Sequence, residues 1–590
     1  MSIVDRRCFQ EMIMINSEYR RLTDGERQVL ERQNCRAEDW NSVEVAGDFD
    51  PCGIRNCTFS GTVRIGNAVR LEGVGLIANC EIGEGAEIRH TTLIECCGES
   101  SFGCGTQVAV INENGGRSVP LFPTLTAQLA YITSIYRHRT QTIEHLNSIF
   151  AKGYTTGTLC RIGRGTRIIG CGILRNVQIG DEAVLEGVSR LENGTVASAS
   201  GQTTYIGAGV KLRDFVICGN SRVDNGTVGE RCFFGNGSHV ASANCVDSMF
   251  FAGSDCENGE FCSVLAGPYT ASHHKATLLI AGMFSFFNAG SGTNFSNHLL
   301  KSGPVHQGIH QRGCKYGSGS YMMLPALDGA YTTVIGHHRN HPNTELFPFS
   351  LVIEREGQTW LIPGANLAAC GNRRDLRKWP QRDRRDLHSA DIINFDECNP
   401  YIAERIEHGL DTIVRLSTDA GDTVIHKGMR IRSAMLRRGA KLYGLALQKY
   451  TGGILACGAE PDAAGEGRWT DALGMYLPVG VMENILNKID AGELNSTAAI
   501  TRAMSEVHNH YENYAAGWAY GRLRRELGHA PSASDIATAI EQGQAAAARL
   551  DALADEDLRA ESDAALSVGY GLDALDEATI AADYKSVRNI

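Results

Sequence analysis

A six-residue hydrophobic period is the feature of this sequence that most constrains its fold. Aliphatic residues recur in steps of 6, 6, 5, 6 and 6 at Ile65, Leu71, Ile77, Ile82, Ile88 and Ile94. The same steps recur 97 residues later, at Ile162, Ile168, Leu174, Ile179, Leu185 and Leu191. A third, weaker array runs through Ile206, Leu212, Cys218 and Val223. Neither a lone helix nor a lone strand has this period, which therefore indicates a structural repeat.

The period predicts a coil of three short strands, with about 17 to 18 residues per turn. One aliphatic residue on each face points inward, and Gly, Asn or Asp takes the corners, where a positive φ is tolerated. Successive coils pair their backbones in parallel, about 4.8 Å apart. One coil cannot bury its own apolar face, so many coils must stack. The 66 glycines, against 14 prolines, suit such a chain.

The repeats resemble the hexapeptide-repeat family, whose [LIV]-G-x4 units build a left-handed parallel β-helix. The string "RIG" opens both matching arrays. The left hand is implied by this resemblance. The strings "SNHLLKSGPVHQGIHQRGCKYGSGSYMMLPA", "NTELFPFSLVIE" and "LIPGANL" resemble a family of large uncharacterised bacterial hexapeptide-repeat proteins, over most of residues 1–450. That resemblance supports the fold and implies no reaction, because function is carried by sites and not by folds.

The sequence predicts a mainly β plus α chain, a left-handed parallel β-helix with a helical insertion and a C-terminal α-helical domain. Thr23 and Glu26 fit a capping box at the start of an N-terminal helix. The expected parts are an N-terminal helical segment (1–47), a first β-helix array (48–120), a helical insertion (121–156), a second array with irregular His-rich coils (157–390) and an α-helical domain (391–590).

Charge and composition exclude several classes of protein. The net charge of -11 does not favour binding to nucleic acid, which is itself an anion. No secretory signal and no run of about 18 apolar residues is visible, so we expect no membrane partner. The 19 cysteines are scattered and form no CxxC pair, which favours reduced thiols in the cytoplasm. Simple hexapeptide enzymes are trimers, so the resemblance implies a homo-oligomer.

Histidine is dense between His273 and His341, which hold eight of the 18 histidines. Many hexapeptide-repeat enzymes transfer an acyl group from acyl-coenzyme A with a histidine base, and the resemblance implies that chemistry here. His306 is the first choice for the base and His310 the second, since both lie beside glycines whose N–H groups could stabilise an oxyanion. The expected substrate-binding residues are Asn297, His298, Lys301, Arg312, His337, Arg373 and Arg374. No tightly bound cofactor is expected.

The alternative function is a β-helix protein that binds a nucleotide sugar or sugar phosphate, either non-catalytic or metal-dependent. The cluster "GNRRDLRKWPQRDRRD" suits phosphate, because arginine offers paired donors, but it also suits a seam to the helical domain. Two histidines spaced HxxxH share one face only in a helix. Gly308 and Gly313 argue against a helix around His306 and His310, so this spacing is weak evidence for a metal site and we name no metal ligand from the sequence.

Overall fold

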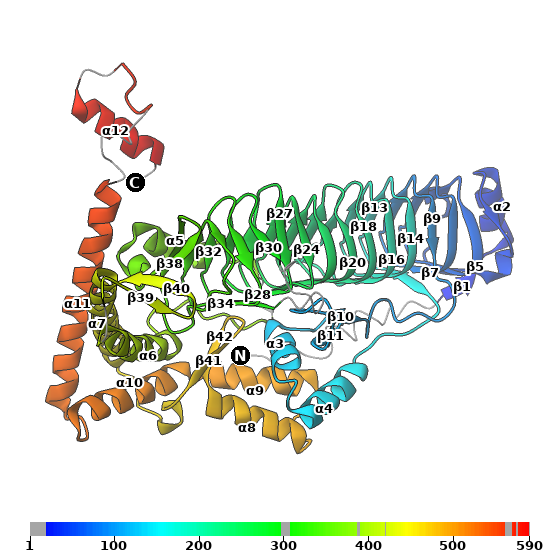
Figure 1. Cartoon of the computed structure of the whole chain (residues 1–590). Helices are drawn as coiled ribbons and strands as arrows, with labels where there is room; N and C mark the ends of the chain where they lie inside the picture. The colour runs from blue at the N-terminus through cyan, green and yellow to red at the C-terminus, as the bar shows by residue number, and fades with distance from the viewer. Residues whose placement is uncertain are drawn as a thin grey trace.

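The computed structural model describes residues 19–296, 307–385, 390–418, 421–560, 569–573 and 576–588, and its main body is a parallel β-solenoid. Figure 1 shows the coils stacked side by side along one axis, with α2 (Asp24–Arg32) at one end and α7 (Ser433–Ala456) and α11 (Ala533–Ala560) at the other. Each regular coil contributes a long, bent strand to a first sheet and a short strand to a second. The predicted parallel solenoid is therefore confirmed.

The first sheet contains β5 (Thr58–Ile65), β7 (Leu76–Ile82), β9 (Leu93–Glu95), β12 (Cys160–Ile162), β14 (Ile173–Ile179), β16 (Arg190–Val196), β18 (Lys211–Ile217), β20 (Val228–Phe234), β22 (Asn244–Phe250), β24 (Gly259–Cys262), β25 (Leu265–Ala266), β27 (Thr277–Ile280), β28 (Gly282–Phe284), β30 (Asn294–Ser296), β31 (Gly308–His310), β33 (Tyr321–Met323), β34 (Ala326–Asp328) and β36 (His337–His338). The second contains β4 (Ile54–Arg55), β6 (Arg70–Glu72), β8 (Glu87–Arg89), β13 (Arg167–Ile169), β15 (Val184–Glu186), β17 (Tyr205–Ile206), β19 (Arg222–Asp224), β21 (His239–Ala241), β23 (Asp255–Glu257), β26 (Ala271–Ser272), β29 (Asn288–Ala289), β32 (Lys315–Tyr316), β35 (Thr333–Ile335) and β37 (Leu351–Arg355), which turns back through β38 (Gln358–Ile362).

The predicted aliphatic positions form the inside of the solenoid. All twelve members of the two matching arrays are buried. Neighbouring strands keep them in line, as Ile168 pairs with Leu185 and Leu185 with Ile206. Cys218 of the third array is the exception, because side chains alternate along a strand and Phe215 and Ile217 take the inward positions. Cys218 faces outward and its Sγ lies 3.6 Å from the carbonyl oxygen of Pro123.

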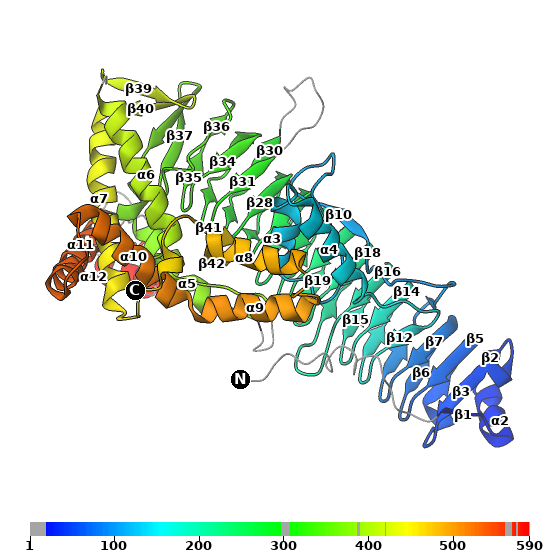
Figure 2. The same ribbon diagram turned by 90° about the horizontal axis from the view of Figure 1, so that it is seen from below.

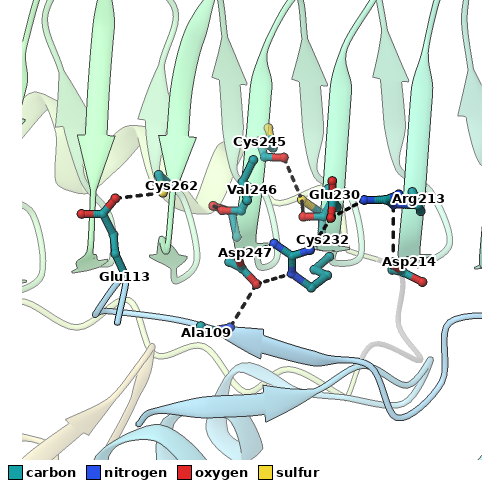
Figure 3. Close-up of polar contacts among 12 residues, drawn as sticks. Ala109, Glu113, Arg213, Asp214, Glu230, Cys232, Cys245, Val246, Asp247 and Cys262 are labelled. Carbon is teal, nitrogen blue, oxygen red and sulfur yellow. Dashed lines mark hydrogen bonds and ion pairs between the residues drawn. The ribbon is translucent and has the colours of Figure 1, made fainter. Parts of the chain in front are cut away.

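One corner of the solenoid is a row of residues in the left-handed backbone conformation. The row comprises Asn176, Asn193, Asp214, Arg231 and Asp247, with φ values of 53°, 48°, 54°, 51° and 48°. Their side chains link neighbouring coils, and the Arg231 guanidinium bonds both carboxylate oxygens of Asp247 at 2.8 Å. Figure 3 shows this corner, where the backbone N–H of Ala109 also donates to Asp247. The corner therefore holds the coils together and receives a strap from outside the solenoid.

That strap belongs to a long insertion between the two matching arrays. It carries the hairpin β10 (Gln107–Ala109) and β11 (Ser118–Pro120), then α3 (Ala127–Ile135) and α4 (Thr140–Ala151). The hairpin falls within the range predicted as the first array, but it pairs only with itself among the described strands. The solenoid resumes directly after the insertion, since Cys160 pairs with Cys80 in parallel. Register is thus kept across the interruption.

The N-terminal segment mixes helix and strand. Helix α2 (Asp24–Arg32) begins with the predicted capping box between Thr23 and Glu26. β1 (Tyr19–Arg21) pairs antiparallel with β3 (Val43–Ala46), whereas β2 (Arg36–Ala37) already pairs in parallel with β5. The pairing of β2 with β5 means that the solenoid starts inside the range 1–47, which was predicted as a helical segment. The sequence did not indicate this start, because the strands after α2 are too short to show a six-residue period. Short 3-10 turns occupy Trp40–Ser42 and Pro51–Gly53.

The C-terminal part is helical with two added hairpins. Its helices are α5 (Cys370–Gln381), α6 (Pro400–Ser417), α7 (Ser433–Ala456), α8 (Val479–Asp490), α9 (Thr497–Asn509), α10 (Tyr511–Leu527), α11 (Ala533–Ala560) and α12 (Glu577–Arg588), and its 3-10 turns are Ala365–Ala368 and Ala463–Gly465. The hairpins are β39 (Thr423–His426) with β40 (Met429–Arg432), and β41 (Trp469–Ala472) with β42 (Met475–Pro478). No described helix is long and apolar enough to cross a membrane.

The C-terminal helices return to the insertion. Figures 1 and 2 show α8 and α9 lying along the same side of the solenoid as α3 and α4. Leu146 of α4 and Leu486 of α8 are buried in one shared apolar cluster. Arg139, just before α4, bonds Asp490 at the end of α8 at 2.8 Å. These contacts bind two segments that are separated by more than 300 residues of sequence.

Candidate metal centre

Four of the residues predicted to act on a substrate lie outside the described residues. They are His306, Asn297, His298 and Lys301. Their predicted roles, including that of His306 as the catalytic base, therefore stay predictions. The remaining predicted site residues are described, and the structure places them in four different environments.

His310 lies inside the solenoid. Its side chain has no exposed surface, and its Nδ1 is 2.6 Å from an equally buried Asp328 carboxylate oxygen. The imidazole is stacked between the rings of Phe284 and Phe295, with centroids 5.0 and 4.6 Å away. The hydroxyl of Tyr316 donates to the same Asp328 oxygen. This environment gives His310 the contacts of a core residue, and nothing in it supports the predicted second base.

Arg312 joins the solenoid to the C-terminal part. Its side chain is 1% exposed and bonds both oxygens of Asp471 in β41, at 2.8 and 3.3 Å. The rings of Phe286 and Tyr476 cover the guanidinium, with centroids 4.3 and 4.1 Å away. Charge pairing and stacking on both faces satisfy this arginine within the protein. The contacts therefore favour an architectural role over substrate binding.

The other predicted residues do not converge with Arg312. His337 is exposed on β36, where its Nε2 lies 3.0 Å from the Gly319 carbonyl oxygen. Arg373 of α5 forms ion pairs with Asp551 and Asp555 of α11, and Arg374 is largely exposed. The basic cluster thus lies at the seam between the solenoid and the helices, which the sequence allowed as its alternative interpretation.

A group with metal-binding chemistry lies elsewhere, on the outer face of the second sheet. His239 of β21 and Asp255 of β23 are directly paired, and Glu257 follows on the same face of β23. The Nδ1 of His239 is 3.1 Å from an Asp255 carboxylate oxygen and 3.5 Å from a Glu257 carboxylate oxygen. All three ligand atoms lie within 4.8 Å of one another. We call these three residues the HDE cluster.

Two further groups approach the HDE cluster. His273, directly after β26, places its Nδ1 3.8 Å from the same Asp255 oxygen. Arg384 places a guanidinium nitrogen 3.7 Å from the other oxygen of Asp255. The three cluster side chains are between 22% and 31% exposed, so solvent reaches them although the backbone holds them in place.

Comparison with known proteins places the chain in a family. Residues 19–72 and 64–417 match the model of a family described as a domain of unknown function, DUF4954. The chain belongs to the DUF4954 family. Residues 453–590 match a second domain of unknown function, DUF6819. An uncharacterized protein of Treponema pallidum (strain Nichols) is 28% identical over 468 residues, which cover 69% of this chain and 63% of the relative. The chain thus spans less than two thirds of that relative's length.

The HDE cluster of this DUF4954 chain offers one imidazole nitrogen and two carboxylates, a donor set suited to a divalent ion of intermediate softness such as Zn²⁺. Zn²⁺ is bound by histidine nitrogen and carboxylate oxygen at about 2.0 to 2.2 Å, which sets ligand atoms roughly 3.3 Å apart in a tetrahedron. The spacings of 3.1 and 3.5 Å around the His239 nitrogen match that requirement. The imidazole of His273, whose Nδ1 lies 3.8 Å from the same Asp255 oxygen, is a further nitrogen donor beside the three. A metal-binding His239 would keep its proton on Nε2 and leave Nδ1 free.

Electrostatics favour ionised carboxylate at this position. Without a bound ion, burial raises the pKa of Asp255, but the hydrogen bond from His239 and the charges of His273, His239 and Arg384 outweigh burial. The pKa of Asp255 is therefore held below its ordinary value. An ionised carboxylate is the form that a cation requires.

The sequence contains a signal for the HDE cluster that the search for HxxxH patterns missed. Residues on one face of the solenoid recur at the length of a coil. His239 and Asp255 are 16 residues apart, as are Glu257 and His273. A search for metal-binding residue types at one coil length would have brought these four together.

Proposed function

We propose that this protein binds a divalent transition-metal ion at the HDE cluster, with His273 as a further ligand. The observation that carries the proposal is the convergence of one imidazole and two carboxylates on adjacent strands. A solenoid face is a rigid platform, because each strand is fixed by backbone pairing on both sides. Rigid placement of ligands lowers the cost of binding an ion.

The main alternative is that the HDE cluster belongs to a row of surface ion pairs. Other coils of the second sheet carry such pairs, for example Arg167 with Glu87 and Arg222 with Asp224. At the HDE cluster the position that Arg222 takes one coil earlier is held by His239, whose ring nitrogen can bind a metal ion. Two carboxylates lie within 3.5 Å of this nitrogen, and a bound cation would neutralise them.

The metal proposal is preferred to acyl transfer on the described geometry. Acyl transfer needs a base that a substrate can reach. His310 is enclosed by Phe284 and Phe295, and His306, the first choice for the base, lies outside the described residues. The HDE cluster is open to solvent and holds two of its ligands as close as 3.1 Å.

The test is metal binding by untagged full-length protein, measured by Zn²⁺ titration calorimetry and by elemental analysis after dialysis. We expect one saturable site, weakened by more than about 10-fold in His239→Ala and in Asp255→Asn. His274→Ala is the matched control, because His274 is exposed beside His273 but is not part of the HDE cluster. Equal binding by wild type and His239→Ala would exclude this centre.

We also propose that the solenoid is left-handed and of the hexapeptide-repeat type. Three observations support this proposal: the six-residue step, the single corner within each regular long strand, and the φ values near 50° of the residues at that corner. An experimentally phased crystal structure fixes the hand directly, and a right-handed coil would contradict this part of the proposal.

A further inference from the structure

Arg384 is fixed beside the HDE cluster by its backbone. The side-chain amide of Asn220 donates to the Arg384 carbonyl oxygen at 2.6 Å. The segment also passes over Gly237, where a Cβ would lie 3.3 Å from the Cβ of Arg384. The glycine therefore permits close approach of this segment to the corner of the solenoid. The arginine is held next to the cluster by contacts that do not use its guanidinium.

The guanidinium itself has donors to spare. Its side chain is 54% exposed, and Asp255 is its ion-pair partner among the described residues. Arginine carries five N–H donors in a planar fork. One interaction at 3.7 Å, on a side chain that is 54% exposed, leaves most of these donors open to solvent.

The charges around a loaded HDE cluster sum to a positive site. A divalent ion would cancel the carboxylates of Asp255 and Glu257. Arg222 is paired with Asp224, and Arg385 is paired with Asp383. With the charge of Asp255 cancelled by the ion, the positive charge of Arg384 would remain without compensation. The exposed Lys275 follows His273 by two residues. The loaded site therefore attracts an anion, whereas the metal-free site presents two carboxylates to it.

We propose that the metal-loaded HDE cluster and Arg384 together bind the phosphate group of a small metabolite. One phosphate oxygen would complete the coordination of the ion, and others would accept hydrogen bonds from the Arg384 guanidinium. A single ion with one guanidinium suits one terminal phosphate. The inference rests on the metal centre proposed above, and it makes phosphate binding strictly dependent on the metal.

The test uses Co²⁺ as the ion and methyl phosphate as the probe, with full-length protein. The visible absorption of bound Co²⁺ reports its coordination. In wild type, methyl phosphate should change that spectrum saturably, and no binding should be detected by calorimetry without metal. Arg384→Ala should keep the affinity for Co²⁺ and lose about 10- to 100-fold in affinity for methyl phosphate, as expected for a charge-assisted hydrogen bond. Arg382→Ala, an exposed arginine of the same segment, is the control.

The outcomes separate the two proposals. Failure of wild type to bind Co²⁺ would overturn the metal centre itself. Normal Co²⁺ binding with an unchanged spectrum on adding methyl phosphate would overturn only the phosphate site. So would equal phosphate affinity in Arg384→Ala and wild type. The same titration with acetate tests the class of anion. If acetate binds the metal-loaded site as tightly as methyl phosphate does, the site is one for carboxylates and not for phosphates.

Discussion

The imidazole of His310 and the carboxylate of Asp328 form a fully enclosed pair inside the solenoid, joined at 2.6 Å. The second nitrogen of His310 and the second oxygen of Asp328 have no hydrogen-bond partner among the described residues. Aromatic rings surround the pair in place of the aliphatic residues that fill the regular coils. The pair is therefore a polar element that depends on both of its members.

Replacing only one member of this pair should lower the free energy of unfolding more than replacing both members. His310→Phe fits the stack between Phe284 and Phe295 but leaves the Asp328 carboxylate buried without its imidazole partner. We expect a loss of about 3 to 5 kcal/mol. The double variant His310→Phe, Asp328→Leu should recover much of that loss, because no unpaired charge remains.

Urea unfolding followed by circular dichroism measures both effects. His337→Ala is the control, since His337 is exposed and its change should stay within about 0.5 kcal/mol of wild type. Additive losses in the double variant would show that His310 and Asp328 do not depend on each other.

Arg312 and Asp471 should behave as a junction between the solenoid and the helices. Removing the guanidinium in Arg312→Ala leaves Asp471 buried and uncompensated, at a cost of about 3 to 5 kcal/mol. Arg312→Lys should not restore stability, because lysine lacks the planar fork and the stacking on Phe286 and Tyr476. Hydrogen exchange should rise in β41 and β42 of either variant while the coils before Arg312 stay protected. Uniform exchange across the whole chain would contradict a local junction.

The sequence predicted the features that recur in every coil, but not the contacts that occur only once in the fold. The six-residue step located the inward aliphatic residues, because every coil imposes the same demand on the chain. Arg312 and Asp471 form one ion pair between residues that are 159 positions apart. No repeat in the sequence indicates that these two residues meet. His310 shows the same limit, since an inward polar residue is visible in the sequence only as a histidine among glycines. Its partner Asp328, 18 residues on, lies one coil away.

The corner row should tolerate glycine better than alanine. Asn193 has φ near 48°, and its side-chain oxygen accepts from the Gly103 backbone N–H at 2.9 Å. Asn193→Gly keeps the backbone conformation and loses the hydrogen bonds, at about 1 kcal/mol each. Asn193→Ala adds the cost of a left-handed conformation, about 1 to 2 kcal/mol more.

Thermal unfolding ranks these variants, and hydrogen exchange at Gly103 reports release of the strap. Asn244→Ala is the control, because Asn244 is exposed at the start of β22 and has no positive φ. Equal melting temperatures for Asn193→Gly and Asn193→Ala would mean that the corner does not require this conformation.

Asp391 should make the fold less stable as the pH rises. Its carboxylate accepts from the backbone N–H of Ala127 at the start of α3, at 2.7 Å. Burial nevertheless raises the pKa of Asp391 from 3.8 to about 6. The folded state therefore holds a proton that the unfolded state has lost between those values, so stability falls as pH rises through about 6. The full loss at pH 7.5 is up to about 3 kcal/mol.

Asp391→Asn removes this titration and keeps an oxygen that can accept from Ala127. We expect the variant to unfold at a higher temperature than wild type at pH 7.5, and the difference to shrink towards pH 4, where the wild-type carboxyl is protonated in the folded state. Scanning calorimetry at a series of pH values measures how the difference in melting temperature changes with pH. A variant that is less stable than wild type at pH 7.5 by the same margin as at pH 4 would show that Asp391 is ionised in the fold and that its bond to α3 outweighs its burial.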